Sequence, residues 1–161
     1  MRLSGSASLL GIRETRRIIG DYVLDLKDFN DRAVFEDEIG RYCYAVDIHE
    51  STPELSDYHK FLDEYTNLRY EKGESYGIPY RILTPAGLRN VLAAGRCVST
   101  DRYMQSSLRV MPGCFITGQA AGAAAAVAVL ENTDTRGFDV RLLQKAIIKL
   151  GGFLPNHSSV S

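Results

Sequence analysis

The stretch of residues 90–130 limits what this chain can fold into more than any other part of its sequence. A short apolar run at residues 91–94 breaks at Gly95, and a polar loop then leads into a segment rich in alanine and glycine. Pro112 suits the first turn of a helix, because a proline lacks the N–H group that would have no intrahelical partner there. We therefore predict a strand over residues 91–94, a loop, and a tightly packing helix from about residue 112 to residue 130.

The loop before this helix has the chemistry of an anion site. The first amides of a helix have no intrahelical acceptor, and the helix dipole adds partial positive charge beside them. Such a helix end can hold a phosphate, a carboxylate or the electron-rich edge of a heterocycle. Arg96, Arg102 and Arg109 bring further positive charge to the same region. The alternative is a well-capped core helix that binds no ligand.

Shorter elements surround this segment, and apolar alternation and turn residues indicate where they lie. We predict strands over residues 18–23, 42–48 and 79–83, a short helix from a cap at Asp25 to residue 29, and a turn at residues 84–87. Residues 31–40 are expected to form a charged connection. After residue 130, Asp139 caps a last helix, which ends at Gly151 and Gly152.

These elements predict an α/β fold with a mixed sheet and packing helices. The length of 161 residues allows one domain with a real hydrophobic core. We expect a flexible lead at residues 1–8, a single domain over residues 9–152, and a tail at residues 153–161. Within the domain, residues 9–83 form a first part, residues 84–130 the strand, loop and helix, and residues 131–152 the terminal helix.

Composition argues against several classes of protein. The formal net charge is −1, and acidic and basic residues are interspersed, which disfavours nucleic acid as the main partner. The three cysteines fit neither a disulfide framework nor a zinc site, so we expect no metal, and reduced thiols in the cytoplasm. The longest uninterrupted apolar run, residues 120–130, is shorter than the roughly 20 residues of a membrane span. Residues 1–10 are too weakly apolar for a secretory signal, and no membrane partner is expected.

Five segments carry a resemblance to a known family. They are GIRETRRIIGDYVL (residues 11–24), YAVDIH (44–49), YGIPYRIL (76–83), NVLAAGRCVS (90–99) and SSLRVMPGCFITGQAAGAAAA (106–126). In this order they resemble the carboxy-terminal part of bacterial FAD-dependent oxidoreductases, relatives of the glutathione-reductase-like flavoproteins. Members of that family begin with a strand, a GxGxxG turn and a helix, and these 161 residues contain no such turn. The resemblance therefore implies an incomplete FAD/NAD(P)-binding-type domain, with residues 9–83 as part of a substrate subdomain.

The resemblance also implies two sets of site residues. On the flavin side these are Gly95, Arg96, Ser106, Ser107, Arg109, Val110 and Met111, next to a helix start that can stabilise negative charge on reduced flavin. On the substrate side they are Arg13, Arg16 and Arg81 as carboxylate contacts and His49 as a substrate-contacting or proton-transferring residue. The alternatives are a solvated strand edge for the arginines near residue 13, a structural ion pair for Arg81 and a surface histidine for His49.

Two functions follow from these observations. The first is an FAD-dependent oxidoreductase acting on a small organic substrate; the second is a non-catalytic remnant or binding module without a complete cofactor site. A hydrolase fits poorly, because no GxSxG, Walker or HExxH pattern occurs. We expect the partner to be a missing amino-terminal FAD-binding half, or a second copy that covers strand edges and the small-residue helix face. FAD should bind the isolated chain weakly or not at all, because much of its affinity comes from the glycine-rich turn.

Overall fold

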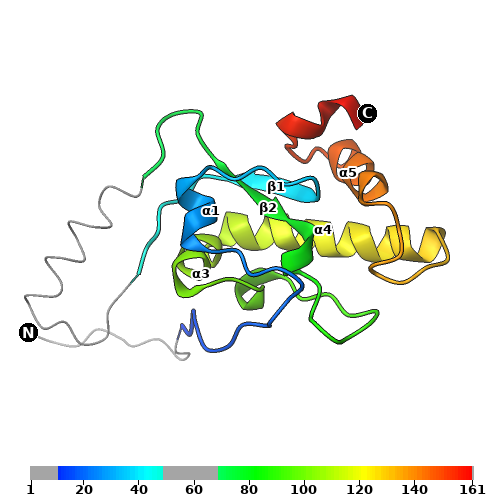
Figure 1. Cartoon of the computed structure of the whole chain (residues 1–161), viewed down its shortest axis with the longest axis horizontal. Helices are drawn as coiled ribbons and strands as arrows, with labels where there is room; N and C mark the ends of the chain where they lie inside the picture. The colour runs from blue at the N-terminus through cyan, green and yellow to red at the C-terminus, as the bar shows by residue number, and fades with distance from the viewer. Residues whose placement is uncertain (1–10, 49–68, 161) are drawn as a thin grey trace, which may run out of the picture.

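The computed structural model describes residues 11–48 and 69–160, and the statements below concern these residues. The helices and strands are α1 (Leu26–Asn30), β1 (Glu38–Tyr42), β2 (Tyr76–Pro79), α3 (Arg102–Leu108), α4 (Met111–Leu130) and α5 (Val140–Lys149). Short 3-10 helices occupy Tyr80–Ile82, Gly95–Cys97 and Pro155–Val160. Helices around a small sheet are compatible with the predicted α/β class. Figure 1 shows α4 running along the molecule, with α3 beside its N-terminal end and α5 towards its C-terminal end.

Helix α4 is the element on which the others pack, and it confirms the strongest prediction from the sequence. It is 20 residues long and has Pro112 in its first turn. The buried face consists mainly of small residues, which are Gly113, Thr117, Ala120, Ala123, Ala124, Val127 and Ala128. Because these side chains are short, neighbouring backbone can come close to the helix axis. The opposite face carries Met111, Phe115, Val129 and Leu130, each of them more than two-thirds exposed. By length and composition alone α4 could cross a membrane, but the core helix of a soluble protein passes the same test.

The sheet differs from the predicted mixed sheet, because β1 and β2 form an antiparallel pair in the part of the chain that the structure describes. Parallel pairing occurs there only as an isolated bridge between Leu24 and Thr100. Gly40, in β1, lies directly against α4: a Cβ atom at this position would lie 2.5 Å from the Cγ2 atom of Ile116. A glycine is therefore required where the strand crosses the helix.

The predicted strand over residues 42–48 was wrong in its bounds. The strand begins at Glu38, inside the predicted charged connection, and ends at Tyr42. The predicted apolar face is confirmed only in part, because Tyr42 and Val46 are buried but Tyr44 is 42% exposed. Residues 43–48 leave the sheet because side chains of α3 take their backbone groups: Ser107 donates to the Tyr44 carbonyl at 2.6 Å and the Asp47 amide donates to Ser106 at 3.0 Å.

Three other predicted strands also need correction. The strand predicted over residues 79–83 lies earlier in the structure, at Tyr76–Pro79, and a 3-10 helix follows it. Residues 91–94 are not a strand, although the Ala93 amide donates to the Leu83 carbonyl at 2.8 Å. Residues 18–23 form only an isolated bridge, between Gly20 and Pro85. Residues 18–23 and 91–94 are partly exposed and lack a full strand ladder, and an apolar run alone does not distinguish such a segment from a strand.

The helix caps were predicted correctly. Asp25 caps α1, and Asp139 caps α5 by accepting a hydrogen bond from the Arg141 amide. The predicted tail is partly wrong, since Leu154 is buried in the core. The core joins residues from all parts of the described chain, among them Leu24, Phe29, Ile39, Tyr76, Ile82, Leu83, Met104, Leu108, Leu143 and Ile147.

Candidate functional site

The turn at Gly95 lies against the first turns of α4. Its φ angle is +78°, a conformation that glycine adopts without steric cost, and its amide donates to Thr117 Oγ1 at 3.0 Å. A Cβ atom built on Gly95 would have Cys114 Sγ, at 3.9 Å, as its nearest neighbour outside the adjoining residues. The backbone here is therefore open to an approaching ligand. The predicted sharp turn is confirmed, although no strand comes before it.

The start of α4 has no side-chain cap. Val110 is the N-cap residue, and its carbonyl accepts a hydrogen bond from the Cys114 amide at 3.1 Å. Tyr42 lies close to this helix end: burial raises its pKa to about 12, while the backbone amide of Gly113 acts in the opposite direction. Met111 is 69% exposed. Two of the predicted flavin-side residues, Val110 and Met111, thus lie at the beginning of the helix. The segment before it was predicted as a loop but contains α3 (Arg102–Leu108).

Ser106 and Ser107 lie on the buried side of α3, and their hydroxyl groups already have protein partners. Ser106 donates to the Tyr103 carbonyl at 2.7 Å, while Ser107 also lies 2.9 Å from the Tyr76 hydroxyl. Together with their bonds to residues 44 and 47, these contacts fasten the chain after β1 to α3. In this structure the two serines hold backbone in place.

Arg96 and Arg109 connect the Gly95 turn to two other segments. The side chain of Arg109 is 7% exposed, donates to the Asp47 carbonyl at 2.7 Å, and lies 3.6 Å from the Glu14 carboxylate. Arg96 donates to the Arg109 carbonyl and to the Ile12 carbonyl, each at 3.1 Å. The two arginines were predicted as flavin-side residues, and the structure brings them together through backbone contacts.

A small hollow lies between the Gly95 turn and the N-terminal segment. Its volume is about 120 Å³, and its lining residues are Ile12, Arg13, Glu14, Thr15, Arg16, Arg96 and Cys97. We call it the arginine hollow. It brings together residues from both predicted sites: Arg13 and Arg16 were predicted as substrate contacts, and Arg96 was predicted as a flavin-side residue. These residues are about 80 positions apart in sequence, and no spacing pattern could have shown that they meet.

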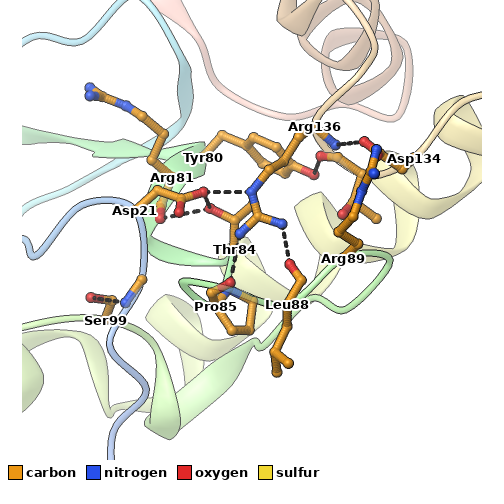
Figure 2. Close-up of polar contacts among 12 residues, drawn as sticks. Asp21, Tyr80, Arg81, Thr84, Pro85, Leu88, Arg89, Ser99, Asp134 and Arg136 are labelled. Atoms are coloured by element: carbon orange, nitrogen blue, oxygen red, sulfur yellow. Dashed lines mark hydrogen bonds and ion pairs between the residues drawn. The ribbon is translucent and has the colours of Figure 1, made fainter.

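A larger cavity lies elsewhere in the described part of the chain, and charged side chains line one part of it. Its volume is about 600 Å³, and Arg136 is central to its polar part. Arg136 donates to Asp21 at 2.8 Å, to the Pro85 carbonyl at 2.6 Å, and to the Leu88 carbonyl (Figure 2). Asp21 also accepts from the Thr84 hydroxyl at 2.7 Å. We call these contacts the Arg136 clamp.

The clamp changes the ionisation of its members and holds three segments together. The hydrogen bond from Arg136 is the main cause that lowers the pKa of Asp21, and the same bond raises the pKa of Arg136. A second ion pair, between Arg89 and Asp134, lies beside the clamp (Figure 2). Sequence analysis missed Asp21 and Arg136, since single charges in separate loops give no periodic signal.

Arg81 lines this larger cavity and is not part of the arginine hollow. Its Nε atom lies 3.0 Å from the Asp37 carboxylate, and its guanidinium group lies over the Tyr22 ring, 5.0 Å from the ring centroid. Asp37 raises the pKa of Arg81 above its ordinary value. The structural ion pair, one of the two roles considered for Arg81, is thus present. Its role in binding substrate stays a prediction.

The remaining sequence predictions concern metals, thiols and His49. Among the described residues no group of three or more histidine, cysteine or acidic side chains could hold a metal ion. Cys43, Cys97 and Cys114 are free thiols, and burial raises the pKa of Cys114. A raised pKa leaves less thiolate, so Cys114 is a poor nucleophile. His49 lies outside the residues that the structure describes.

Comparison with known proteins gives one match. The family model described as FAD dependent oxidoreductase matches residues 1–147, which is most of the chain. No curated protein and no solved structure matches at a significant level. The matched range contains the arginine hollow, the Gly95 turn, α4 and the Arg136 clamp.

Proposed function

The chain belongs to the FAD-dependent oxidoreductase family, and we propose that it forms the carboxy-terminal part of such an enzyme. Membership implies FAD in the complete enzyme, where the flavin would supply hydride or electron transfer to or from an organic substrate. We propose further that the complete enzyme is a bacterial relative of the glutathione-reductase-like flavoproteins. In it, residues 84–130 would contribute contacts on the flavin side, and residues 9–83 would belong to a substrate subdomain.

One observation supports this proposal most strongly: the Gly95 turn and the start of α4 lie together. The amide of Gly95 bonds to Thr117 in α4, and Arg96 bonds to the carbonyl of Arg109, which comes two residues before the helix begins. An open backbone position, a helix start whose N-cap residue supplies no side-chain cap, and a buried guanidinium group are thus adjacent. This combination fits an electron-rich heterocycle, because positive partial charges meet where a ligand can approach the backbone.

The chain's own residues would divide the work as follows. Gly95 would let the ligand approach, and Arg96 and Met111, both exposed, would contact it. Arg109 is held by Asp47 and would orient Arg96 through its backbone carbonyl. Ser106 and Ser107 would act indirectly, by holding residues 44–47 against α3. Arg13, Arg16 and His49 would act on the substrate side.

Three further parts of the proposal concern the surroundings of the chain. The exposed residues Phe115, Val129 and Leu130 of α4 fit a surface that another part of the enzyme covers. We propose that an FAD-binding half carrying the glycine-rich turn supplies that cover, or that two copies associate. We propose a cytoplasmic location and a small organic substrate, with no nucleic acid or membrane as partner.

The proposal is tested by titrating FAD and following flavin fluorescence, with the chain alone and with a dinucleotide-binding half added in trans. We expect little binding to the chain alone and clear binding to the pair. The Gly95→Trp substitution should abolish that binding by filling the open position. Gly87→Trp is the matched control, because Gly87 has a similar φ angle of +75° and no atoms near a Cβ position.

The outcomes separate the parts of the proposal. Tight stoichiometric binding of FAD by the single chain would show that the site is complete without a second half. Equal FAD binding by the Gly95→Trp variant and the unaltered pair would contradict the placement of the flavin at the Gly95 turn. Loss of binding in both tryptophan variants would point to misfolding, which a circular dichroism spectrum of each variant would detect beforehand.

A further inference from the structure

The arginine hollow carries more positive charge than its neighbours neutralise. Arg13, Arg16 and Arg96 line it, and the guanidinium groups of Arg17 and Arg109 contact Glu14, which also lines it. Glu14 is the carboxylate among the lining residues, and it pairs with Arg17 at 3.2 Å and approaches Arg109 at 3.6 Å. Arg13, Arg16 and Arg96 have no carboxylate partner among the residues that the structure describes. Arg96 donates to two backbone carbonyls, which do not neutralise its charge. Like charges that line one small space repel one another unless an anion lies between them.

The backbone that carries these arginines is fixed in place. Gln105 donates to the Arg13 carbonyl at 3.1 Å, and the Ile18 amide donates to the Cys97 carbonyl at 2.8 Å. Arg17 reaches the Asp101 carbonyl at 3.3 Å. The N-terminal segment is therefore tied to residues 96–105 on both sides of Arg16. A ligand would find the arginines already brought together, which lowers the entropy cost of binding.

Size and chemistry limit the ligand. A hollow of about 120 Å³ has the volume of roughly four water molecules. It can take a carboxylate or phosphate group with a few attached carbon atoms, while a larger body would extend out of it. Guanidinium groups suit both anions, because their parallel N–H donors match two oxygens at once. The larger cavity is less suited to binding an anion, because its two arginines, Arg81 and Arg136, already have carboxylate partners.

We infer that the arginine hollow binds the anionic group of a small organic ligand through Arg13, Arg16 and Arg96. The inference rests on the proposed function, in that it gives the chemical class of the substrate for the site beside the flavin. A carboxylate of the substrate and a phosphate of a cofactor share the chemistry that the hollow recognises. The two sources are separated by the probes used below.

The test is a titration of the full chain without flavin, so that its failure would leave the FAD experiment unaffected. The amide signals of Arg96 and Cys97 are followed by nuclear magnetic resonance, since the chain has no tryptophan for fluorescence. Sodium succinate and sodium phosphate are the probes, and sodium chloride at equal ionic strength is the reference. We expect saturable shifts with at least one probe, and the tighter one identifies carboxylate or phosphate as the preferred group.

Variants then show whether these arginines are responsible. Arg13→Gln combined with Arg16→Gln should weaken binding about tenfold or more, because charge-assisted hydrogen bonds are lost. Arg13→Lys with Arg16→Lys keeps the charge but loses the paired donors, and should weaken it less. Arg141→Gln is the matched control: Arg141 is an exposed arginine on α5 and should leave binding unchanged. Shifts no larger than with chloride, or equal weakening in the Arg141 variant, would overturn the inference.

Discussion

The arginine hollow and the Arg136 clamp contain the same kind of side chain in opposite electrostatic states. In the clamp, Arg136 has a carboxylate and two carbonyls as acceptors, so the protein itself satisfies its charge. In the hollow, Arg13 and Arg16 have no such acceptor within the described part of the chain. The clamp therefore stabilises the fold, while the arginines of the hollow remain able to bind an anion. The number of arginines in a segment does not distinguish the two cases; their partners do.

This comparison predicts a graded series of effects on stability, and the largest should come from a pair that is more deeply buried than the clamp. Arg41 lies 2.7 Å from Glu38, with side-chain exposures of 8% and 0%. The Arg41→Ala substitution would leave a buried carboxylate without its guanidinium partner. We expect a loss of about 3–5 kcal/mol in the free energy of unfolding. Urea denaturation followed by circular dichroism would measure it.

The nearby His157 gives this prediction a control. Its Nε2 atom lies 3.6 Å from Glu38, so His157 is a second polar side chain beside that carboxylate. Adding His157→Ala to Arg41→Ala should therefore increase the loss of stability, because the buried carboxylate then lacks both neighbours. A loss of stability under 1 kcal/mol for Arg41→Ala would mean that Glu38 is not held as a buried ion.

The second prediction concerns the clamp. Arg136→Ala removes hydrogen bonds to three acceptors in two other segments, but the side chain is 30% exposed and solvent screens part of its charge. We expect a loss of about 1.5–3 kcal/mol, the range for hydrogen bonds to charged groups. Arg89→Ala is the control, because Arg89 is 84% exposed and pairs with only one carboxylate. Equal losses in the two variants would contradict the idea that the clamp holds the loops together.

The third prediction is a pH dependence of stability that the clamp should show. Arg136 lowers the pKa of Asp21 in the folded state below its unfolded value, which is about 3.9. The contribution of Asp21 to stability is therefore fully present above pH 3.9 and is lost as the pH falls through the folded pKa. Asp21→Asn should flatten the fall in stability at acidic pH. Thermal unfolding between pH 2 and pH 6, compared with the unaltered chain and with Arg13→Gln, would show the difference.

How much of this could be predicted from the sequence depends on the range of the interaction. Local signals were sufficient for Pro112 at the start of α4, for Asp139 as a cap and for the turn at Gly95. They failed at residues 91–94, where a half-buried segment has no ladder, and at residues 42–48, where hydroxyl groups of α3 replace a strand partner.

The candidate site shows the same limit. Arg13, Arg16 and Arg96 were identified one by one, from segments that resemble a family, but their meeting in one hollow follows from tertiary contacts. Asp21 and Arg136, 115 positions apart, gave no signal at all. A sequence read without homologues shows which residues can carry charge. Which of those charges are already neutralised becomes visible only when the chain is folded.

The smallest effect, and the sharpest test of the comparison, is expected in the hollow itself. Arg13 and Arg16 are exposed, and neither has a carboxylate partner to lose among residues 11–48 and 69–160. Replacing both by glutamine should change the free energy of unfolding by less than about 0.5 kcal/mol, as for most surface substitutions, and relief of charge repulsion would act towards higher stability. The change should shrink further in high salt, because salt screens the repulsion between exposed guanidinium groups. Urea denaturation at low and high sodium chloride would measure both effects. A loss as large as that of Arg136→Ala would show that the hollow is held together by its arginines, and the distinction between a structural cluster and a binding cluster would then fail.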